Sequence, residues 1–385
     1  MKTIAVLTAT RAEYGLLSPI IKALKECPEF YVKIIATGSH LSPEFGLTFK
    51  EIEKDGIKID KKIEILLSAD TPSAISKSMG LAMIGFADYF ADNLPDALLV
   101  LGDRYETLAV CCAAMNERIP IIHLYGGETT EGAVDEAVRH AITKLSYLHL
   151  TSTEEYRRRV IQLGENPGRV FTVGAVGVEN ALKQPLLSKQ ELEESLNMEL
   201  DCPYAVVTFH PVTLESSSAE KQCKELLAAL EEYSYMRFIV TKANADANGR
   251  VINKLFEEYA MKHSNVKVYN SLGFIRYLSA VKYADMVIGN SSSGLIEVPS
   301  FGIPTINIGD RQKGRLKADS VIDCVPLKEE ISTAIMKAES AEMRKLAACI
   351  TNPYGDGNTT DKILSAIKKM FQNGIDLKKQ FYDIA

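Results

Sequence analysis

Residues 3–26 of the chain read TIAVLTATRAEYGLLSPIIKALKE. The first six residues are mostly apolar and include Ile4 and Val6, which predicts a buried strand. A loop carrying Arg11 is expected next, and then a helix over 16–26 that ends before Pro28. A short strand, a loop and a helix of this length begin a βαβ unit. The quoted stretch therefore predicts an α/β fold with a mostly parallel sheet.

The same alternation continues along the chain in two sets. Further strands are predicted at 31–36, 97–101, 119–124, 170–173, 204–209, 237–241, 266–269, 286–289 and 305–308. A polar segment at 183–204 separates the two sets and is the expected linker. We therefore predict two Rossmann-like, doubly wound parallel-sheet domains, an N-terminal one over 1–182 and a C-terminal one over 183–365.

The C-terminal residues 366–385 include most of a closing helix expected at about 361–373. These residues are predicted to complete the first domain. Ligands of open parallel sheets bind outside the carboxyl ends of the strands. We therefore expect an interdomain cleft, with the chemistry carried by the loops that directly follow strands.

The composition narrows the class of protein. The 385 residues are 46% hydrophobic and carry a net charge of −6, which predicts no nucleic-acid partner and no polybasic membrane contact. Seven scattered cysteines without a C-x-x-C pair argue against a disulfide framework and favour a cytoplasmic location. The N-terminus has no leader pattern, and the absence of an 18-residue apolar run predicts no membrane span.

The motifs that commonly hold cofactors are absent from the sequence. No G-x-G-x-x-G and no G-x-x-x-x-G-K-[ST] occurs, which argues against a dinucleotide cofactor and against an NTPase. The six histidines show no metal-ligand spacing, and no acidic calcium loop is present. We therefore expect no cofactor and no bound metal.

Two strand-end loops of the first half carry candidate residues. Arg11 stands just before a helix N-terminus, where it could contact a phosphate or a base, or be an ordinary exposed arginine. Asp103 follows Gly102 directly at a strand end and is a catalytic candidate. Glu106 is interpreted as a first-turn acid that complements the helix dipole, with a catalytic role as the alternative.

The densest candidate stretch is residues 123–140, HLYGGETTEGAVDEAVRH. A double glycine precedes several carboxylates, among them the catalytic candidates Glu128 and Asp135. Paired carboxylates in different environments can divide acid and base roles. Asp135 and Arg139, a substrate-binding candidate, share a helix face at i, i+4. The alternative is a capped helix with a solvated ion pair, although a double glycine there is costly unless a ligand approaches the backbone.

The second half carries a different kind of candidate. His210 ends a strand before a proline and faces the expected cleft. The hydroxyls and N–H groups of a serine-rich loop suit a diphosphate, and a carboxylate one turn onward could accept two ribose hydroxyls. The substrate-binding candidates of this half are Asn244, Ser291, Ser292, Ser293, Glu297 and Arg311. The alternative interpretation is a well-capped helix.

Taken together, the motifs resemble the hydrolysing UDP-N-acetylglucosamine 2-epimerases of the sialic-acid and legionaminic-acid pathways. The resemblance covers nearly the whole chain and rests on TRAEYG (10–15), LGDRYE (101–106), GGE (126–128), RHAITK (139–144), LTSTEEY (150–156), FHPVT (209–213), GNSSSGLIEVP (289–299) and GDRQKGR (309–315). It implies a GT-B-like fold and a UDP-sugar substrate. It also implies anti-elimination of UDP through 2-acetamidoglucal, then hydration to N-acetylmannosamine, without NAD.

The same resemblance implies residue roles and a homodimer. Asp103 and Asp135 would be acid/base carboxylates around C2 and C3, with Glu128 a third, and His210 would assist the departing diphosphate. Arg11 would lie near the uridine and phosphates, the three serines would hold the diphosphate, Glu297 the ribose, and Arg311 would add charge.

Two positions depart from the family pattern. Tyr125 stands where many relatives have glutamate, and Gly15 stands where the non-hydrolysing branch has lysine. The first departure leaves open a different sugar, UDP-2,4-diacetamido-2,4,6-trideoxyglucose, as in legionaminic acid synthesis. The remaining alternatives are a GT-B glycosyltransferase and a non-catalytic nucleotide-sugar sensor.

Overall fold

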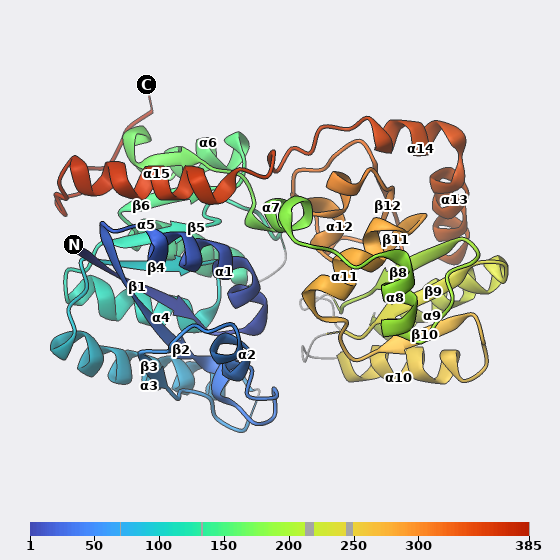
Figure 1. Ribbon diagram of the computed structural model, residues 1–385, viewed down its shortest axis with the longest axis horizontal. Coiled ribbons are helices and arrows are strands. Elements are labelled where there is room, and N and C mark those ends of the chain that lie inside the picture. The colour runs from blue at the N-terminus through green and yellow to red at the C-terminus, as the bar shows by residue number, and fades with distance from the viewer. Residues whose placement is uncertain (70, 132–133, 212–218, 244–248, 385) are drawn as a thin grey trace. The chain divides into compact units, whose positions relative to one another are not determined.

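The computed structural model describes residues 1–69, 71–131, 134–211, 219–243 and 249–384. Two compact units divide the chain. Unit 1 comprises Met1–Glu128, Val134–Val176 and Gly355–Ala385, and unit 2 comprises Thr129–Ala133 and Gly177–Tyr354. Each unit is a sheet covered by helices (Figure 1).

Unit 1 is built on a seven-stranded sheet in the order β3-β2-β1-β4-β5-β6-β7, and all of its strand pairs among the described residues are parallel. The strands are β1 (Lys2–Thr8), β2 (Phe30–Thr37), β3 (Lys61–Ile63), β4 (Ala97–Leu101), β5 (Ile121–Leu124), β6 (Leu148–Thr151) and β7 (Val170–Thr172). The helices are α1 (Arg11–Glu26), α2 (Phe49–Lys54), α3 (Pro72–Asp92), α4 (Tyr105–Asn116), α5 (Asp135–Leu145), α6 (Glu154–Gln162) and α15 (Thr359–Gln372).

Unit 2 repeats the arrangement with a six-stranded parallel sheet in the order β10-β9-β8-β11-β12-β13. Its strands are β8 (Tyr204–Thr208), β9 (Arg237–Thr241), β10 (Val266–Tyr269), β11 (Met286–Gly289), β12 (Thr305–Ile308) and β13 (Val321–Cys324). Its helices are α7 (Val176–Lys183, whose first residue belongs to unit 1), α8 (Lys189–Leu196), α9 (Ala219–Leu230), α10 (Gly249–Ala260), α11 (Gly273–Lys282), α12 (Ser293–Ile296), α13 (Lys328–Glu339) and α14 (Ala341–Ala348).

Both sheets are apolar on both faces, as parallel sheets covered by helices require. Along β1, Ile4 and Val6 belong to one buried cluster, whereas Ala5 and Leu7 belong to another. Strand β8 divides in the same way between two clusters of unit 2. The expected fold class, two Rossmann-like doubly wound parallel-sheet units, is confirmed.

Helix α1 begins earlier than the sequence pattern suggested. The loop expected over 11–15 is wrong, because Thr10 caps the helix and Arg11 is its first residue. The Thr10 hydroxyl accepts the Glu13 N–H at 3.2 Å, and the Glu13 carboxylate accepts the Thr10 N–H at 3.2 Å. This reciprocal capping box overrides the turn expected from the small residues.

Other elements differ from the prediction in instructive ways. Strands β3, β6 and β13 were not predicted, and β3 begins with two exposed lysines that conceal it. The expected linker contains α8, which Ser188 and Glu191 start with a second capping box.

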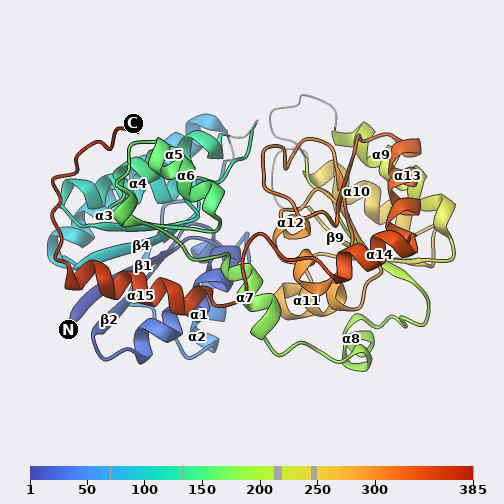
Figure 2. The same cartoon turned by 90° about the horizontal axis from the view of Figure 1, so that it is seen from above.

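The closing helix α15 ends at Gln372, so no helix continues through the described residues up to 384. Gly374, with a φ of +75°, follows its end. Helix α15 packs along unit 1 beside α1 (Figure 2).

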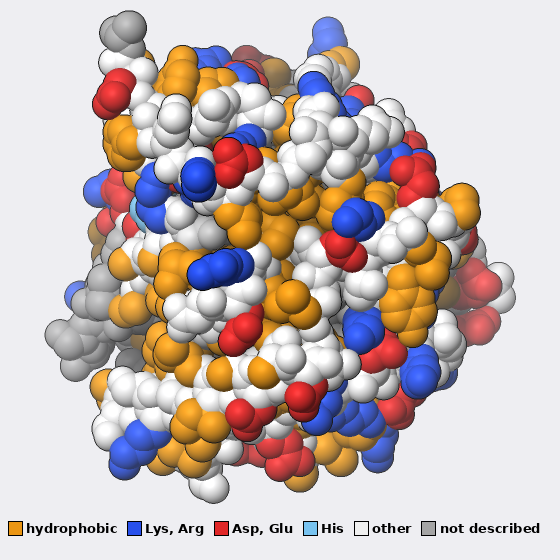
Figure 3. Space-filling view, turned by 90° about the vertical axis from the view of Figure 1, so that its left-hand side faces the viewer, with side chains coloured by type: hydrophobic (Ala, Val, Ile, Leu, Met, Phe, Trp, Pro, Cys, Tyr) orange, Lys and Arg blue, Asp and Glu red, His pale blue; other side chains and the backbone are white. Residues whose placement is uncertain are grey.

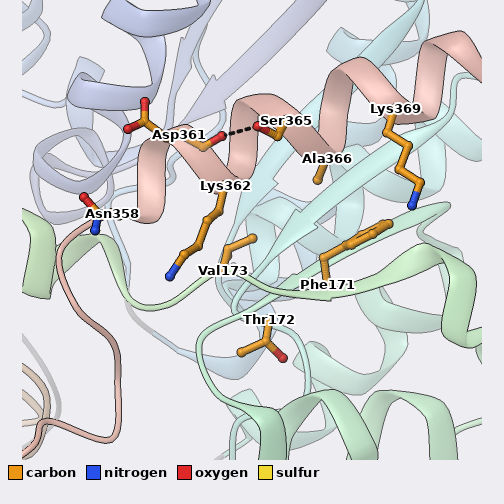
Figure 4. Close-up of a pocket in the computed structure, with 9 residues that line it drawn as sticks. All are labelled: Phe171, Thr172, Val173, Asn358, Asp361, Lys362, Ser365, Ala366 and Lys369. Carbon is orange, nitrogen blue, oxygen red and sulfur yellow. Dashed lines mark hydrogen bonds between the residues drawn. The ribbon is translucent and has the colours of Figure 1, made fainter.

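The exterior of unit 1 is mixed in character. On the face shown in Figure 3, basic and acidic side chains alternate among apolar ones. A cavity of about 380 Å³ lies between edge strand β7 and α15, where Phe171 and Lys369 face each other (Figure 4). None of the candidate site residues lines this cavity.

No helix among the described residues is long and apolar enough to span a membrane.

Candidate active site

Each sheet has one point at which its strand order reverses, and ligands of doubly wound folds bind there. In unit 1 that point lies between β1 and β4, and in unit 2 between β8 and β11. The loop after β4 carries Asp103, directly after Gly102, and the loop after β8 carries His210. The topology therefore places both residues at the edges where the fold binds ligands.

Arg139 organises the unit 1 site. Its side chain is only 1% exposed and its guanidinium donates to three acceptors. One nitrogen donates to the Asp103 carboxylate, and the other donates to Glu136 Oε2 at 2.7 Å and to the Glu128 carbonyl at 2.8 Å. A buried arginine with planar, divergent donors holds a carboxylate in one orientation better than a flexible lysine could. Arg139 thus fixes Asp103 from the facing helix α5.

Helix α5 carries an ion pair of Arg139 in addition to the shared face expected for Asp135 and Arg139. Arg139 pairs with Glu136 at i, i+3, and the other Glu136 oxygen lies 3.1 Å from His140 Nε2. Asp135 is exposed at the first position of α5. Sequence reasoning missed Glu136, although its spacing of three and four residues from Arg139 and His140 was a usable signal.

Glu128 lies next to this network and is 4% exposed. Its Oε1 accepts a hydrogen bond from the Ser152 hydroxyl at 2.9 Å. The preceding Gly127 has a φ of +78°, and a Cβ atom there would lie 2.4 Å from the Tyr156 carbonyl oxygen. The close approach of the protein's own backbone therefore already requires a glycine at position 127.

A second charged group lies where α1 and α4 begin. Arg104 donates to Glu106 at 2.5 Å, and its Nε lies 4.0 Å from Glu13. Burial raises the pKa of Glu13 to about 7, although the Arg104 charge opposes the shift. Glu106, interpreted from the sequence as a first-turn acid, is 1% exposed and is the ion-pair partner of Arg104. Arg11 is half-exposed and pairs with Glu51 at 3.0 Å.

Asn290 organises the unit 2 site. Its side chain is 1% exposed and exchanges two hydrogen bonds with the backbone of His210, at 2.7 and 2.8 Å. The backbone carbonyl of Asn290 accepts hydrogen bonds from the Arg311 side chain at 3.0 Å and from the Gln312 side chain at 2.9 Å. Asn290 therefore joins the loops after β8, β11 and β12. Sequence reasoning treated it only as part of the serine-rich loop.

His210 is neutral at pH 7 in this environment. Burial, assisted by the nearby Arg311 charge, lowers its pKa to about 3. Its Nδ1 and the Ser293 hydroxyl oxygen are buried and have no hydrogen-bond partner among the described residues. A neutral imidazole and an unpaired serine hydroxyl suit hydrogen bonding to an anion.

The remaining candidates are placed as follows. Ser291, Ser292 and Ser293 lie half-buried around the start of α12, and Glu297 follows that helix directly. Asn244 lies outside the described residues. Within the described ranges, no group of three His, Cys, Asp or Glu side chains is arranged to hold a metal ion.

Comparison with known proteins identifies the family. A family model described as UDP-N-acetylglucosamine 2-epimerase matches residues 22–368. The chain belongs to the UDP-N-acetylglucosamine 2-epimerase family. The resemblance inferred from the motifs is thereby confirmed.

Two similar sequences and one similar solved structure show which proteins this chain resembles. A Campylobacter jejuni protein, "GDP/UDP-N,N'-diacetylbacillosamine 2-epimerase (hydrolyzing)", is 43% identical and covers 100% of this chain and 99% of its own length. An Escherichia coli "polysialic acid biosynthesis protein P7" is 42% identical, over 100% of this chain and 98% of its own. The solved structure of the Methanocaldococcus jannaschii UDP-GlcNAc 2-epimerase in complex with UDP-GlcNAc and UDP has a TM-score of 0.79 at 18% identity, covering 96% of this chain and 100% of that one. The fold of this chain is accordingly GT-B-like.

Proposed function

We propose that this epimerase is of the hydrolysing kind: it releases UDP from a UDP-2-acetamido sugar and adds water to give the free 2-epimer. The observation that carries the proposal is the buried Arg139, which holds Asp103 in one orientation at the strand-order reversal of unit 1. The proposal also draws on the hydrolysing relative at 43% identity.

In the proposed first step a carboxylate removes the proton from C2, and the bond between C1 and the diphosphate oxygen breaks. The electron pair of the C–H bond forms the C1=C2 double bond, and the electron pair of the C–O bond leaves with UDP. Asp103, Glu128 and Asp135 are the candidate acids and bases, since each is a carboxylate beside the Arg139 network or on α5. Water then adds to C1 and a proton adds to C2 on the opposite face, which inverts that carbon.

The leaving group is assigned to residues of unit 2. The hydroxyls of Ser291, Ser292 and Ser293 and the charge of Arg311 are suited to a diphosphate. Neutral His210 donates a hydrogen bond from a ring nitrogen to the departing oxygen rather than acting as a cation. Arg11 supplies a further half-exposed charge at the start of α1 for the uridine or its phosphates.

For the sugar we favour UDP-2,4-diacetamido-2,4,6-trideoxyglucose, with UDP-N-acetylglucosamine as the second candidate. The first agrees with the diacetylbacillosamine relative, and the second with the polysialic acid relative of nearly equal identity. Tyr125, the position that departs from the family pattern, has an unusual φ of +68°, and its hydroxyl accepts the Val176 N–H at 2.9 Å. A bulky residue held in this conformation marks a position that the surrounding structure constrains strongly.

The test is an NMR time course of the protein with each UDP-sugar, without added metal or NAD, in deuterated water. Release of UDP with deuterium at C2 of the product supports elimination and hydration, and the sugar that turns over identifies the substrate. Protium retained at C2 contradicts the proposed route. UDP-sugar binding without release favours a sensor, and turnover only with an added acceptor favours a glycosyltransferase.

A further inference from the structure

Gly177 occupies a helical position where the backbone does not need glycine. It lies in the first turn of α7 and is buried, and its φ is not in the left-handed region. Alanine is the better helix former at such a position. The reason for a glycine must therefore be the space beside it.

That space is filled by Glu297. A Cβ atom on Gly177 would lie 2.0 Å from Glu297 Oε1 and 2.9 Å from its Cδ. Both distances are far shorter than a van der Waals contact, so any side chain at this position would displace the carboxylate. Both residues belong to unit 2.

Neighbouring elements define where Glu297 lies. Its backbone N–H donates to the Ser293 carbonyl at 3.0 Å, which ties it to the serine-rich loop. Tyr277 of α11 is close enough for the Glu297 charge to add to the rise in its pKa, which is caused chiefly by burial. The first turn of α7, with its partial positive charge, favours a carboxylate on the remaining side.

We propose that Gly177 is a positioning residue for nucleotide recognition: its bare backbone lets the Glu297 carboxylate lie where it accepts hydrogen bonds from the two ribose hydroxyls of UDP. The inference rests on the proposed function, because it assumes that unit 2 binds UDP. It assigns the recognition of ribose to a pair of residues, of which only Glu297 touches the ligand.

The experiment measures the dissociation constants of UDP and 2′-deoxy-UDP by calorimetry. The wild-type protein should prefer UDP by about tenfold or more, because a hydrogen bond to a charged group has that effect. Gly177→Ala should reduce this preference to less than about threefold while the melting temperature stays the same or rises. The matched control is Gly80→Ala on α3, where a Cβ atom meets nothing within 4 Å and the preference should not change.

A double-mutant cycle separates positioning from a general structural effect. Glu297→Asp should lower the UDP preference in the wild-type background but not lower it further in Gly177→Ala, because the carboxylate is already displaced there. Glu297→Gln keeps the side-chain volume and should lose the preference as well, which keeps the inference testable if Gly177→Ala melts early.

Each result has a distinct meaning. An unchanged preference in Gly177→Ala, additive effects in the cycle, or an unchanged preference in Glu297→Gln would overturn the positioning role while leaving the proposed function intact. If the wild-type protein binds no UDP, the proposed function fails and the inference fails with it.

Discussion

The two candidate sites are organised by opposite means. In unit 1 a buried arginine holds carboxylates from α5 and from the loop after β4, so the site is a network of full charges. In unit 2 the buried Asn290 joins three loops through its own neutral groups, the side-chain amide and the backbone carbonyl, and the carbonyl accepts from Arg311 and Gln312. Proton transfer needs carboxylates held in fixed orientations. A diphosphate brings its own negative charge, so its binding site needs hydrogen-bond donors that cost little free energy to bury when no ligand is bound.

The difference has an energetic consequence. Removing one partner of a buried ion pair leaves an uncompensated charge and costs about 3–5 kcal/mol. A neutral hydrogen bond contributes only about 1 kcal/mol. Substitutions in the unit 1 network should therefore affect both folding and catalysis, whereas substitutions around Asn290 should affect mainly ligand binding.

The largest effect is expected from Arg139→Met. The carboxylates of Asp103 and Glu136 would lose their common partner, so the free energy of unfolding should fall by about 3–5 kcal/mol and UDP release should stop. Urea denaturation and a UDP-release assay measure the two effects. Lys224→Met, which breaks an exposed pair with Glu220 on α9, is the control and should leave the urea midpoint unchanged. An unchanged midpoint in Arg139→Met would show that the network is not stabilising.

Asp103→Asn should separate catalysis from binding. The amide keeps the size of the side chain but cannot exchange the proton, so kcat should fall by about 10²- to 10⁴-fold while the Kd of UDP changes little. Steady-state kinetics and calorimetry measure both quantities, with Asp361→Asn on the exposed face of α15 as the control. Full activity in Asp103→Asn would remove this residue from the mechanism.

Glu13→Gln should change the pH dependence of stability. The pKa of Glu13 is 4.5 in the unfolded chain and about 7 in the folded one, so the folded state binds more protons between these values. Stability should therefore fall by about 3 kcal/mol as pH rises from 4.5 through 7 in the wild-type protein, and this contribution should vanish in the variant. Urea unfolding at pH 5, 6, 7 and 8 compares them, with Glu26→Gln on the same helix as the control. If the free energy of unfolding depends on pH in the same way in Glu13→Gln and in the wild-type protein, the pKa of Glu13 is not raised.

Asn290→Ala should have the smallest effect of the four substitutions, and the quantity that it changes should be the affinity for UDP. Losing the two hydrogen bonds to His210 should weaken UDP binding by about tenfold, with a smaller change in kcat. Asn307→Ala is the matched control, because this buried amide of the same unit donates instead to Asp323 on β13. Equal UDP affinities in the two variants would mean that Asn290 does not organise the binding loops.

Much of the fold was predictable because strands buried on both faces have a strong signal. The continuous apolar runs of β1, β4, β8 and β11 predicted the central strands of both sheets. The edge strands β3 and β13 could not be found in this way, because half-exposed edges carry polar residues such as Lys61 and Asp323. The capping pair Thr10 and Glu13 is a sequence signal for the start of α1. The small residues beside it favoured a loop instead, so the start of the helix was predicted too late.

The sequence by itself determined the fold class, the family and the strand-end loops that carry chemistry, because these depend on local periodicity and on motifs in order along the chain. Only the tertiary structure decided which side chains pair. It brought Arg139 to Asp103 across 36 residues and Asn290 to His210 across 80. Such pairings depend on which strands lie side by side, and a sequence pattern does not contain that distance. The same holds for Gly177, whose function became visible only when Glu297 was found in the space that its missing side chain leaves.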